Sequence, residues 1–140
     1  MEVVRNGAET ATGPTERFTG KVYIDRVAIP TRESRLSALS VHFAPGGRTA
    51  WHTHLYGQTI WVTEGLGVIQ LRGGPIEVIH SGDRVFFQPG EDHWHGAAPH
   101  QFMTHLAIQQ VDDQDNEAQW GMPVSDTEYA RAREILHPEA

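Results

Sequence analysis

The stretch GGRTAWHTHLYGQT, residues 46 to 59, carries the strongest signal in the chain for both architecture and chemistry. At its centre are His52 and His54, and Gln58 follows after a short turn. Side chains two residues apart in an extended strand point to the same face, so the two histidines direct their imidazoles into one space. His93, from a later strand, supplies a third imidazole. Three imidazoles and one amide oxygen suit a divalent transition metal, so we predict that these four residues form a metal site.

Size and composition exclude several classes of protein. The chain has 140 residues, the size of one ordinary domain, and we expect a single domain over its whole length. Its net charge of −7, with no basic run, disfavours a nucleic acid or an anionic membrane as partner. Cysteine is absent, which excludes disulfides and a thiolate nucleophile. With no apolar run resembling a signal peptide or a membrane span, these features predict a cytoplasmic protein.

Short strand-like runs separated by turn signals fill the middle of the chain. Alternating segments rich in β-branched residues predict strands at residues 21–29, 35–43, 59–63, 67–71, 76–79, 84–88 and 103–109. Glycine and proline mark the turns between them, including a predicted turn at Glu64-Gly65. Many short strands at this spacing predict a β-sandwich or barrel.

The two ends of the chain lie outside this pattern. Residues 1 to about 20 include a polar stretch with glycine and proline, which we expect to form a surface arm. Ser125 and Glu128 fit a capping box, which predicts a short helix over about residues 125 to 136. The acidic stretch from Asp112 to Ala118 is expected to be an exposed connection without a role in a site.

The histidine pattern resembles the two sequence motifs of the cupin superfamily. The first motif is a glycine, five residues, His-x-His, three or four residues, usually a glutamate, six residues and a glycine. The residues that fit it are Gly46, His52, His54, Gln58 and Gly65. The second motif runs from a glycine to a proline–glycine turn and a histidine, and the residues that fit it are Gly82, Gly90 and His93. The chain departs from the pattern where Gln58 replaces the usual glutamate and where Ala97 replaces a frequent asparagine.

This resemblance implies an all-β fold, a single jelly-roll-like cupin barrel followed by the short C-terminal helix. It also implies one divalent metal ion at the centre of the barrel. Cupins commonly pair through edge strands, so a homodimer or homotetramer is expected.

Three segments show a narrower resemblance, to the small bacterial cupin hydroxynitrile lyases. They are TAWHTHLYGQT (49 to 59), PGEDHWHGAAP (89 to 99) and MTHLAIQ (103 to 109). Those enzymes depend on manganese and cleave cyanohydrins to hydrogen cyanide and a carbonyl compound. Carried over by position, the resemblance implies metal ligands at His52, His54, Gln58 and His93. It further implies catalytic roles for two pocket histidines, His95 and His105, with His105 as the base.

Strand parity extends the expected pocket. Val41 and Phe43 line one wall if residues 35 to 43 form one unbroken strand. His105 shares parity with Gln109, so Gln109 faces the cavity if His105 does. We expect an apolar pocket around a few polar groups, as is usual for small ligands.

The amide of Gln58 has a consequence for the chemistry. A carboxylate ligand would leave a divalent centre with one net positive charge, whereas an amide leaves two. The more positive centre is the better Lewis acid and the harder one to oxidise, which favours non-redox chemistry over oxygen activation. The resemblance puts Mn(II) first, and the ligand types leave Fe(II), Ni(II), Co(II) and Zn(II) open.

Three other functions stay open at this stage. One is a non-redox sugar-acid or keto-acid isomerase, whose pocket should hold an arginine or lysine for a carboxylate; Arg48 and Arg84 are the nearest candidates in sequence. Another is a dioxygenase on a small organic substrate, which the neutral Gln58 disfavours. The third is a non-catalytic binding module, such as a small-molecule sensor. Such a protein would be expected to carry an added DNA-binding helix pair or a partner domain, and 140 residues leave room for neither.

Overall fold

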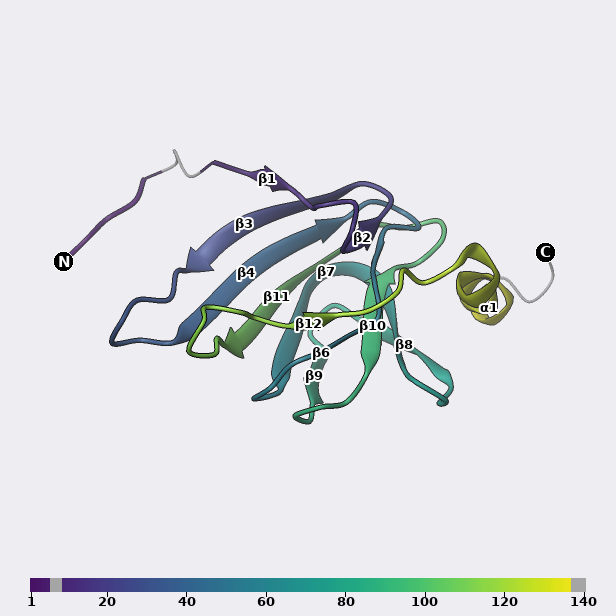
Figure 1. Cartoon of the computed structure of the whole chain (residues 1–140). Coiled ribbons are helices and arrows are strands. Elements are labelled where there is room, and N and C mark those ends of the chain that lie inside the picture. Colours follow the sequence, from purple (N-terminus) through teal and green to yellow (C-terminus); the bar gives the residue numbers. More distant parts are fainter. Residues whose placement is uncertain (6–8, 137–140) are drawn as a thin grey trace.

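The described strands form one antiparallel sheet that curls back on itself, with a helix on its outside (Figure 1). The computed structural model describes residues 1–5 and 9–136, so the expected arm over residues 1 to 20 lies partly outside the described residues. The elements are β1 (Ala11–Thr12), β2 (Phe18–Thr19), β3 (Val22–Ala28), β4 (Leu36–Phe43), β5 (Arg48–Thr49), β6 (His52–Thr53), β7 (Gln58–Leu71), β8 (Ile76–His80), β9 (Arg84–Phe87), β10 (His93–Ala97), β11 (Met103–Gln110), β12 (Gln119–Trp120) and α1 (Asp126–Leu136). No helix in the described ranges is long and apolar enough to cross a membrane.

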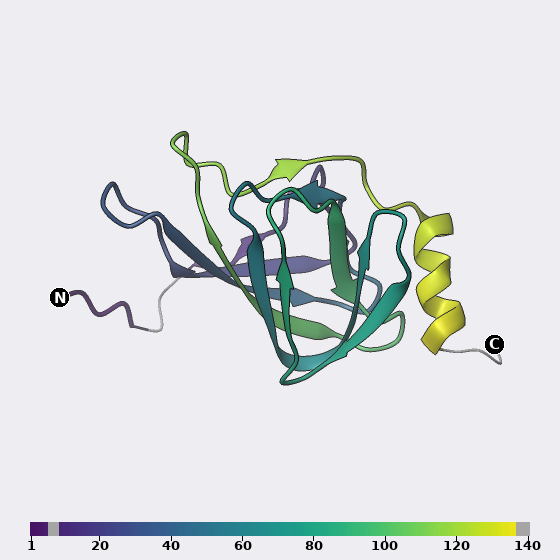
Figure 2. The same cartoon turned by 90° about the horizontal axis from the view of Figure 1, so that it is seen from below.

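Along the sheet the order of the strands is β1-β3-β4-β11-β7-β10-β5-β2, while β8 and β9 pair with β7, and β6 pairs with both β10 and β12. Seen from below, the sheet wraps around an interior, with α1 standing outside it (Figure 2). The predicted all-β architecture with a C-terminal helix is therefore confirmed.

Strand β7 joins the two halves of the barrel. Its first part pairs with β11 and β9, and its second part pairs with β10 and β8. Gly65, with a φ of 87°, lies between the two parts. The predicted turn at Glu64-Gly65 is wrong, because strands on both sides hold the chain extended and the glycine bends one continuous strand instead. A Cβ at this position would overlap the carbonyl oxygen of Phe102.

Alternation along β4 and β11 determines what fills the interior. Val41 and Phe43 of β4 are buried, as are His105, Ala107 and Gln109 of β11. Residues two apart on a strand share a face, so the two polar side chains enter the barrel with the apolar ones. The strand predicted over 35 to 43 is continuous from residue 36, and the parity inferred from it is confirmed.

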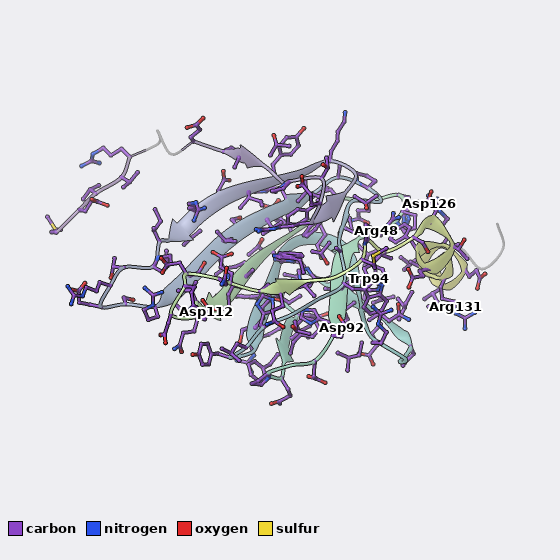
Figure 3. The ribbon with its side chains drawn as sticks, in the orientation of Figure 1. Arg48, Asp92, Trp94, Asp112, Asp126 and Arg131 are labelled. Atoms are coloured by element: carbon purple, nitrogen blue, oxygen red, sulfur yellow. The ribbon has the colours of Figure 1, made fainter. Side chains whose placement is uncertain are left out.

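Helix α1 covers the outer face of the second half of the sheet. The capping box forms as predicted: Glu128 N donates to Ser125 Oγ at 3.1 Å, and Ser125 N donates to Glu128 Oε1 at 3.0 Å. The hydroxyl of Tyr129 donates to the carbonyl of Ala97 at 2.6 Å. Buried Arg48 donates to the carboxylate of Asp126 at 2.9 Å, at the start of the helix (Figure 3).

The two roles of Gly65, backbone conformation and close packing, can be separated by substitution. We expect Gly73→Ala to lower the free energy of unfolding by about 1 kcal/mol, because Gly73 has a φ of 79° but its Cβ would meet open space. We expect Gly65→Ala to lower it by roughly 3 kcal/mol or more, because strain and overlap add. Urea unfolding of both variants measures the difference, and equal losses would show that the close approach to Phe102 carries no energetic weight.

Candidate metal centre and pocket

A cavity of about 250 Å³ opens into the barrel beside the cluster of histidines. Its wall contains the predicted pocket residues Val41, Phe43 and Gln109. The predicted site residues that also line it are His52, His54, Gln58, His95 and His105. His93 is fully buried next to them. The structure therefore brings together the residues predicted as metal ligands, catalytic histidines and pocket wall.

Strands β6 and β10 position three of the imidazoles. His52 of β6 is the register partner of His93 on β10, and His95 follows on the same face of β10. Trp94, between these two histidines, points the other way and packs against Tyr129 of the helix. The ligand nitrogens of His52, His93 and His95 all lie within 4.8 Å of one another.

Gln58 reaches this cluster from the start of β7. Its Oε1 lies 3.2 Å from His93 Nε2 and 3.2 Å from His95 Nε2. The turn that carries the chain from His54 to Gln58 needs Gly57, which has a φ of 81° and whose Cβ would lie 2.7 Å from the carbonyl oxygen of Phe87. The amide oxygen is thereby placed among the ring nitrogens.

Backbone carbonyls fix the tautomers of three histidines. His52 Nδ1 lies 2.9 Å from the carbonyl of Ala50, and His93 Nδ1 lies 2.9 Å from that of Glu91. His54 Nδ1 lies 2.6 Å from the carbonyl of Glu117. A carbonyl oxygen only accepts, so each Nδ1 carries the proton and each Nε2 keeps a lone pair.

These lone pairs fit a bound cation. His54 Nε2 is buried without a hydrogen-bond partner. His93 Nε2 faces Gln58 Oε1 with no proton between them, since the ring proton is on Nδ1. Buried acceptors without donors are costly unless a positive charge serves them. The residues present therefore fit a divalent metal of the kind that imidazole and amide oxygen bind, while the ligand role of each residue stays a prediction.

His95 and His105 form a pair at the cavity wall. His105 Nε2 lies 2.9 Å from His95 Nδ1. The other nitrogen of His105, Nδ1, is buried without a partner. If His95 Nε2 donates to Gln58 Oε1, His95 Nδ1 accepts from His105 and the lone pair of His105 Nδ1 stays free to take a proton.

Burial keeps the imidazoles neutral. Desolvation lowers the pKa of His93 to about 4 and that of His105 to about 4. Desolvation and then the neighbouring histidines lower the pKa of His52 and of His95 well below the usual value, and desolvation also lowers the pKa of His54. Neutral imidazoles are the form that binds a metal or accepts a proton.

Two aromatic rings that the sequence did not single out hold the imidazoles in place. Phe87 stacks on His93 with ring centroids 3.6 Å apart and planes inclined by 9°. Trp120 stacks on His52 at 4.6 Å and 27°. Trp120 lies on β12, a short strand that pairs with β6 and was not predicted.

The stretch from Asp112 to Ala118 is only partly the exposed connection that was expected. Residues 113 to 116 are exposed, but Glu117 and Ala118 line the cavity. Ser37, a buried partner of Glu117, was also missed, although it shares strand parity with Val41 and that parity could have found it. Nothing local in the sequence distinguishes Glu117 from its acidic neighbours.

The cations considered for a carboxylate substrate lie elsewhere. Arg48 donates a hydrogen bond to Asp126 at the start of α1. Arg84 of β9 is the register partner of Trp61 on β7, and both residues are exposed. Among the described residues that line the cavity, the arginines are Arg17 and Arg26, and both are exposed.

Comparison with known proteins gives consistent results. The family model described as Cupin domain matches residues 39–108. The (R)-mandelonitrile lyase of Granulicella tundricola is 48% identical over 132 residues, which cover 94% of this chain and 100% of the relative. The solved structure of a cupin-like protein from Thermotoga maritima is 36% identical with a TM-score of 0.78, over 87% of this chain and 92% of that one. A cupin 2 conserved barrel domain protein from Rhodopseudomonas palustris, 14% identical with a TM-score of 0.67 over 91% and 85% of the chains, shares the fold.

The lowered pKa values predict that the metal-free protein loses stability in weak acid. The unfolded chain takes up protons near pH 6.5, whereas folded His93 and His105 do so only near pH 4. Stability is therefore fully present above pH 6.5 and is lost as the pH falls towards 4, by about 2 kcal/mol for each of these two residues between pH 7 and 5. Urea unfolding at both pH values measures the loss. Exposed His80 provides the control His80→Gln, which should show the same dependence, and a flat profile in the unaltered protein would contradict the assignment.

Proposed function

Because the chain belongs to the cupin family, we propose that it is a metal-dependent lyase that cleaves cyanohydrins to hydrogen cyanide and an aldehyde or ketone. The observation that carries the proposal is the neutral donor set beside a largely apolar cavity. Among the described residues, the atoms that converge there come from histidines and Gln58 rather than from carboxylates. The similarity to a mandelonitrile lyase over almost the whole chain supports the same reaction class.

The residues proposed to hold the metal are His52, His54, Gln58 and His93. The Nε2 atoms of the three histidines and the amide oxygen of Gln58 carry no net charge. A divalent ion held by them would therefore keep its full positive charge, and Mn(II) is the first candidate. Such an ion supplies Lewis-acid stabilisation to negative charge that develops on the substrate oxygen or on cyanide.

His105 is the proposed base. Its unpartnered Nδ1 accepts the proton of the cyanohydrin hydroxyl, and the imidazolium is stabilised through the hydrogen bond to His95. As the oxygen becomes a carbonyl, the bond between the carbinol carbon and cyanide breaks and its electron pair leaves with cyanide. The proton held on the imidazole then leaves with cyanide as hydrogen cyanide, which returns His105 to its neutral form.

The pocket wall determines how the substrate lies. Val41, Phe43 and Ala107 present apolar surface beside the two histidines, which suits an aromatic or aliphatic substituent rather than a charged one. Gln109 is the proposed hydrogen-bonding residue at this wall. A sugar-acid or keto-acid isomerase would instead need a cation beside the cluster, and the arginines of the described wall lie in its exposed part.

Release of benzaldehyde from mandelonitrile at pH 5, where the spontaneous reaction is slow, tests the proposal. His105 stays neutral at this pH because its pKa is lowered to about 4. We expect His105→Asn to lower kcat by roughly 100-fold or more, since a general base contributes about that much. Metal content, measured by elemental analysis, should be unchanged.

The matched control is His80→Asn, because His80 is an exposed histidine on β8 that does not line the cavity. It should leave kcat unchanged. No benzaldehyde release from fully metal-loaded protein would reject the lyase, and oxygen consumption on a small organic substrate would favour the dioxygenase alternative.

The charge argument for Gln58 predicts opposite effects on binding and turnover. Gln58→Glu should raise the affinity for Mn(II), because a carboxylate adds attraction. It should lower turnover of the fully loaded protein by roughly 10-fold, because a less positive centre is a weaker Lewis acid. Titration with Mn(II) and the mandelonitrile assay at saturating metal measure the two effects. Unchanged turnover in Gln58→Glu would show that the neutral charge of this ligand does not contribute to catalysis.

A further inference from the structure

We infer that Glu117 is a positioning residue, which acts through Ser37 and Gln109 to hold the amide of Gln58 with its oxygen towards the imidazole cluster. The inference concerns the ligand geometry and rests on the proposed function only in taking the cluster to be a metal site.

Four buried or half-buried polar side chains form one continuous hydrogen-bonded chain. Gln58 Nε2 donates to Gln109 Oε1 at 3.0 Å, and Gln109 Nε2 donates to Ser37 Oγ at 3.2 Å. Ser37 Oγ donates to Glu117 Oε1 at 2.8 Å. Ser37, Gln58 and Gln109 are at most 4% exposed, so water does not offer them alternative partners.

The carboxylate at the end gives this chain its direction. An ionised carboxylate only accepts, so the single proton of Ser37 is committed to Glu117 and Ser37 must accept from Gln109. Gln109 therefore presents its NH₂ group to Ser37 and its oxygen to Gln58. Gln58 in turn presents its NH₂ group to Gln109, which leaves its oxygen facing the ring nitrogens of His93 and His95.

The direction matters because a side-chain amide can lie in two orientations. One presents the partial negative charge of its oxygen to the cluster, and the other presents the partial positive charge of its NH₂ group. With the oxygen towards the cluster, Gln58 adds an acceptor to the lone pairs of the imidazoles. With the amide reversed, an NH₂ group would point at the place where a cation fits, and the donor would repel it. A carboxylate ligand has no such ambiguity, so the need to fix orientation is specific to a glutamine.

Glu117 also reaches the cluster by a second path. Its backbone carbonyl accepts the Nδ1 proton of His54 at 2.6 Å. One residue thus orients an imidazole through its main chain and an amide through its side chain. Outer partners of metal ligands commonly act in this way.

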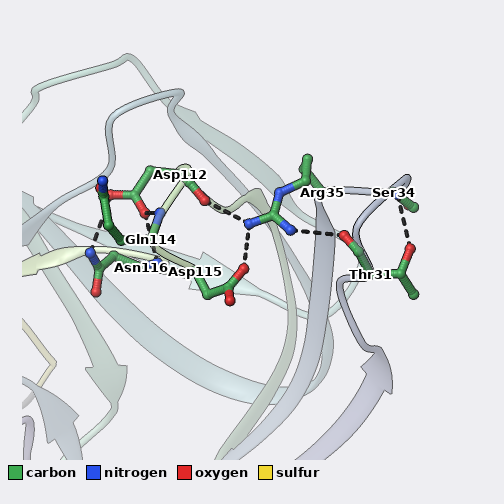
Figure 4. A network of polar contacts seen from close by, with 7 residues as sticks. All are labelled: Thr31, Ser34, Arg35, Asp112, Gln114, Asp115 and Asn116. Carbon is green, nitrogen blue, oxygen red and sulfur yellow. Dashed lines mark hydrogen bonds and ion pairs between the residues drawn. The ribbon is translucent and has the colours of Figure 1, made fainter.

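The segment before Glu117 is fixed from outside the barrel (Figure 4). Arg35 donates to the carbonyl of Asp112 at 2.7 Å and to the side chain of Asp115. The carboxylate of Asp112 accepts from the backbone N–H groups of Gln114 at 2.9 Å and Asn116 at 2.8 Å. This network sets where the chain enters the barrel wall at Glu117.

Two substitutions disturb the hydrogen-bonded chain without touching the cluster or the backbone carbonyl at 117. Ser37→Ala removes the middle link and breaks it. Glu117→Gln replaces a group that only accepts by one that can also donate, so the direction of the hydrogen bonds is no longer fixed. The matched control is Asp113→Asn, which removes one negative charge from an exposed position of the same segment. Circular dichroism establishes that each variant is folded before binding is compared.

Equilibrium titration with Mn(II) is the principal measurement. We expect Ser37→Ala and Glu117→Gln each to weaken binding by roughly 10- to 100-fold, the usual effect of losing an outer partner, and Asp113→Asn to leave it unchanged. The double variant should bind as weakly as either single variant, because both act on one chain. Affinities equal to that of Asp113→Asn, or losses that add in the double variant, would overturn the inference.

Nuclear magnetic resonance of the metal-free protein tests the orientation directly. The side-chain amide protons of Gln58 should exchange slowly with solvent in the unaltered chain and in Asp113→Asn, and faster in Ser37→Ala. Equal exchange in all three would refute the inference even if the metal site is correct. Conversely, normal Mn(II) binding without cyanohydrin cleavage would reject the proposed function and leave the role of Glu117 standing.

Discussion

A carbonyl or carboxylate oxygen accepts hydrogen bonds and never donates them, and this constraint orders the interior of the barrel. Carbonyls at Ala50, Glu91 and Glu117 hold the protons of three imidazoles on the outer side of the cluster. The remaining lone pairs are left facing inward, where His54 Nε2 has no partner. A protein interior tolerates such acceptors when a positive charge serves them, so the acceptor pattern is compatible with a bound cation.

The fold serves this pattern through a few long strands. Strand β7 begins at Gln58 in one half of the barrel and pairs with β10, which carries His93 and His95, in the other half. The bend at Gly65 lets this one strand belong to both halves of the barrel. Stacking by Phe87 and Trp120 then restricts the rings of His93 and His52. The geometry of the histidine cluster is thus set mainly by backbone pairing and ring packing.

The sequence predicted what depends on spacing along one strand. The His52–His54 pair, the shared face of His93 and His95, and the inward parity of Val41, Phe43 and Gln109 all follow from a two-residue repeat. The turn at Gly65 was mispredicted, because turn propensity is local while the pairing that keeps the strand continuous comes from distant strands. Glu117 was read as solvated, because its partner Ser37 lies 80 residues away and no local pattern records that contact.

The double attachment of Glu117 places an unusual demand on the stretch that precedes it. Because the main chain and the side chain of this residue each reach the cluster, shifting the register by one position would displace both at once. Substitutions at the exposed Asp113 and Gln114 keep the spacing and are expected to leave those attachments in place, whereas an insertion or deletion in this stretch would shift both. Homologues that share this arrangement should therefore differ more in which amino acids occupy the segment between β11 and β12 than in the length of that segment.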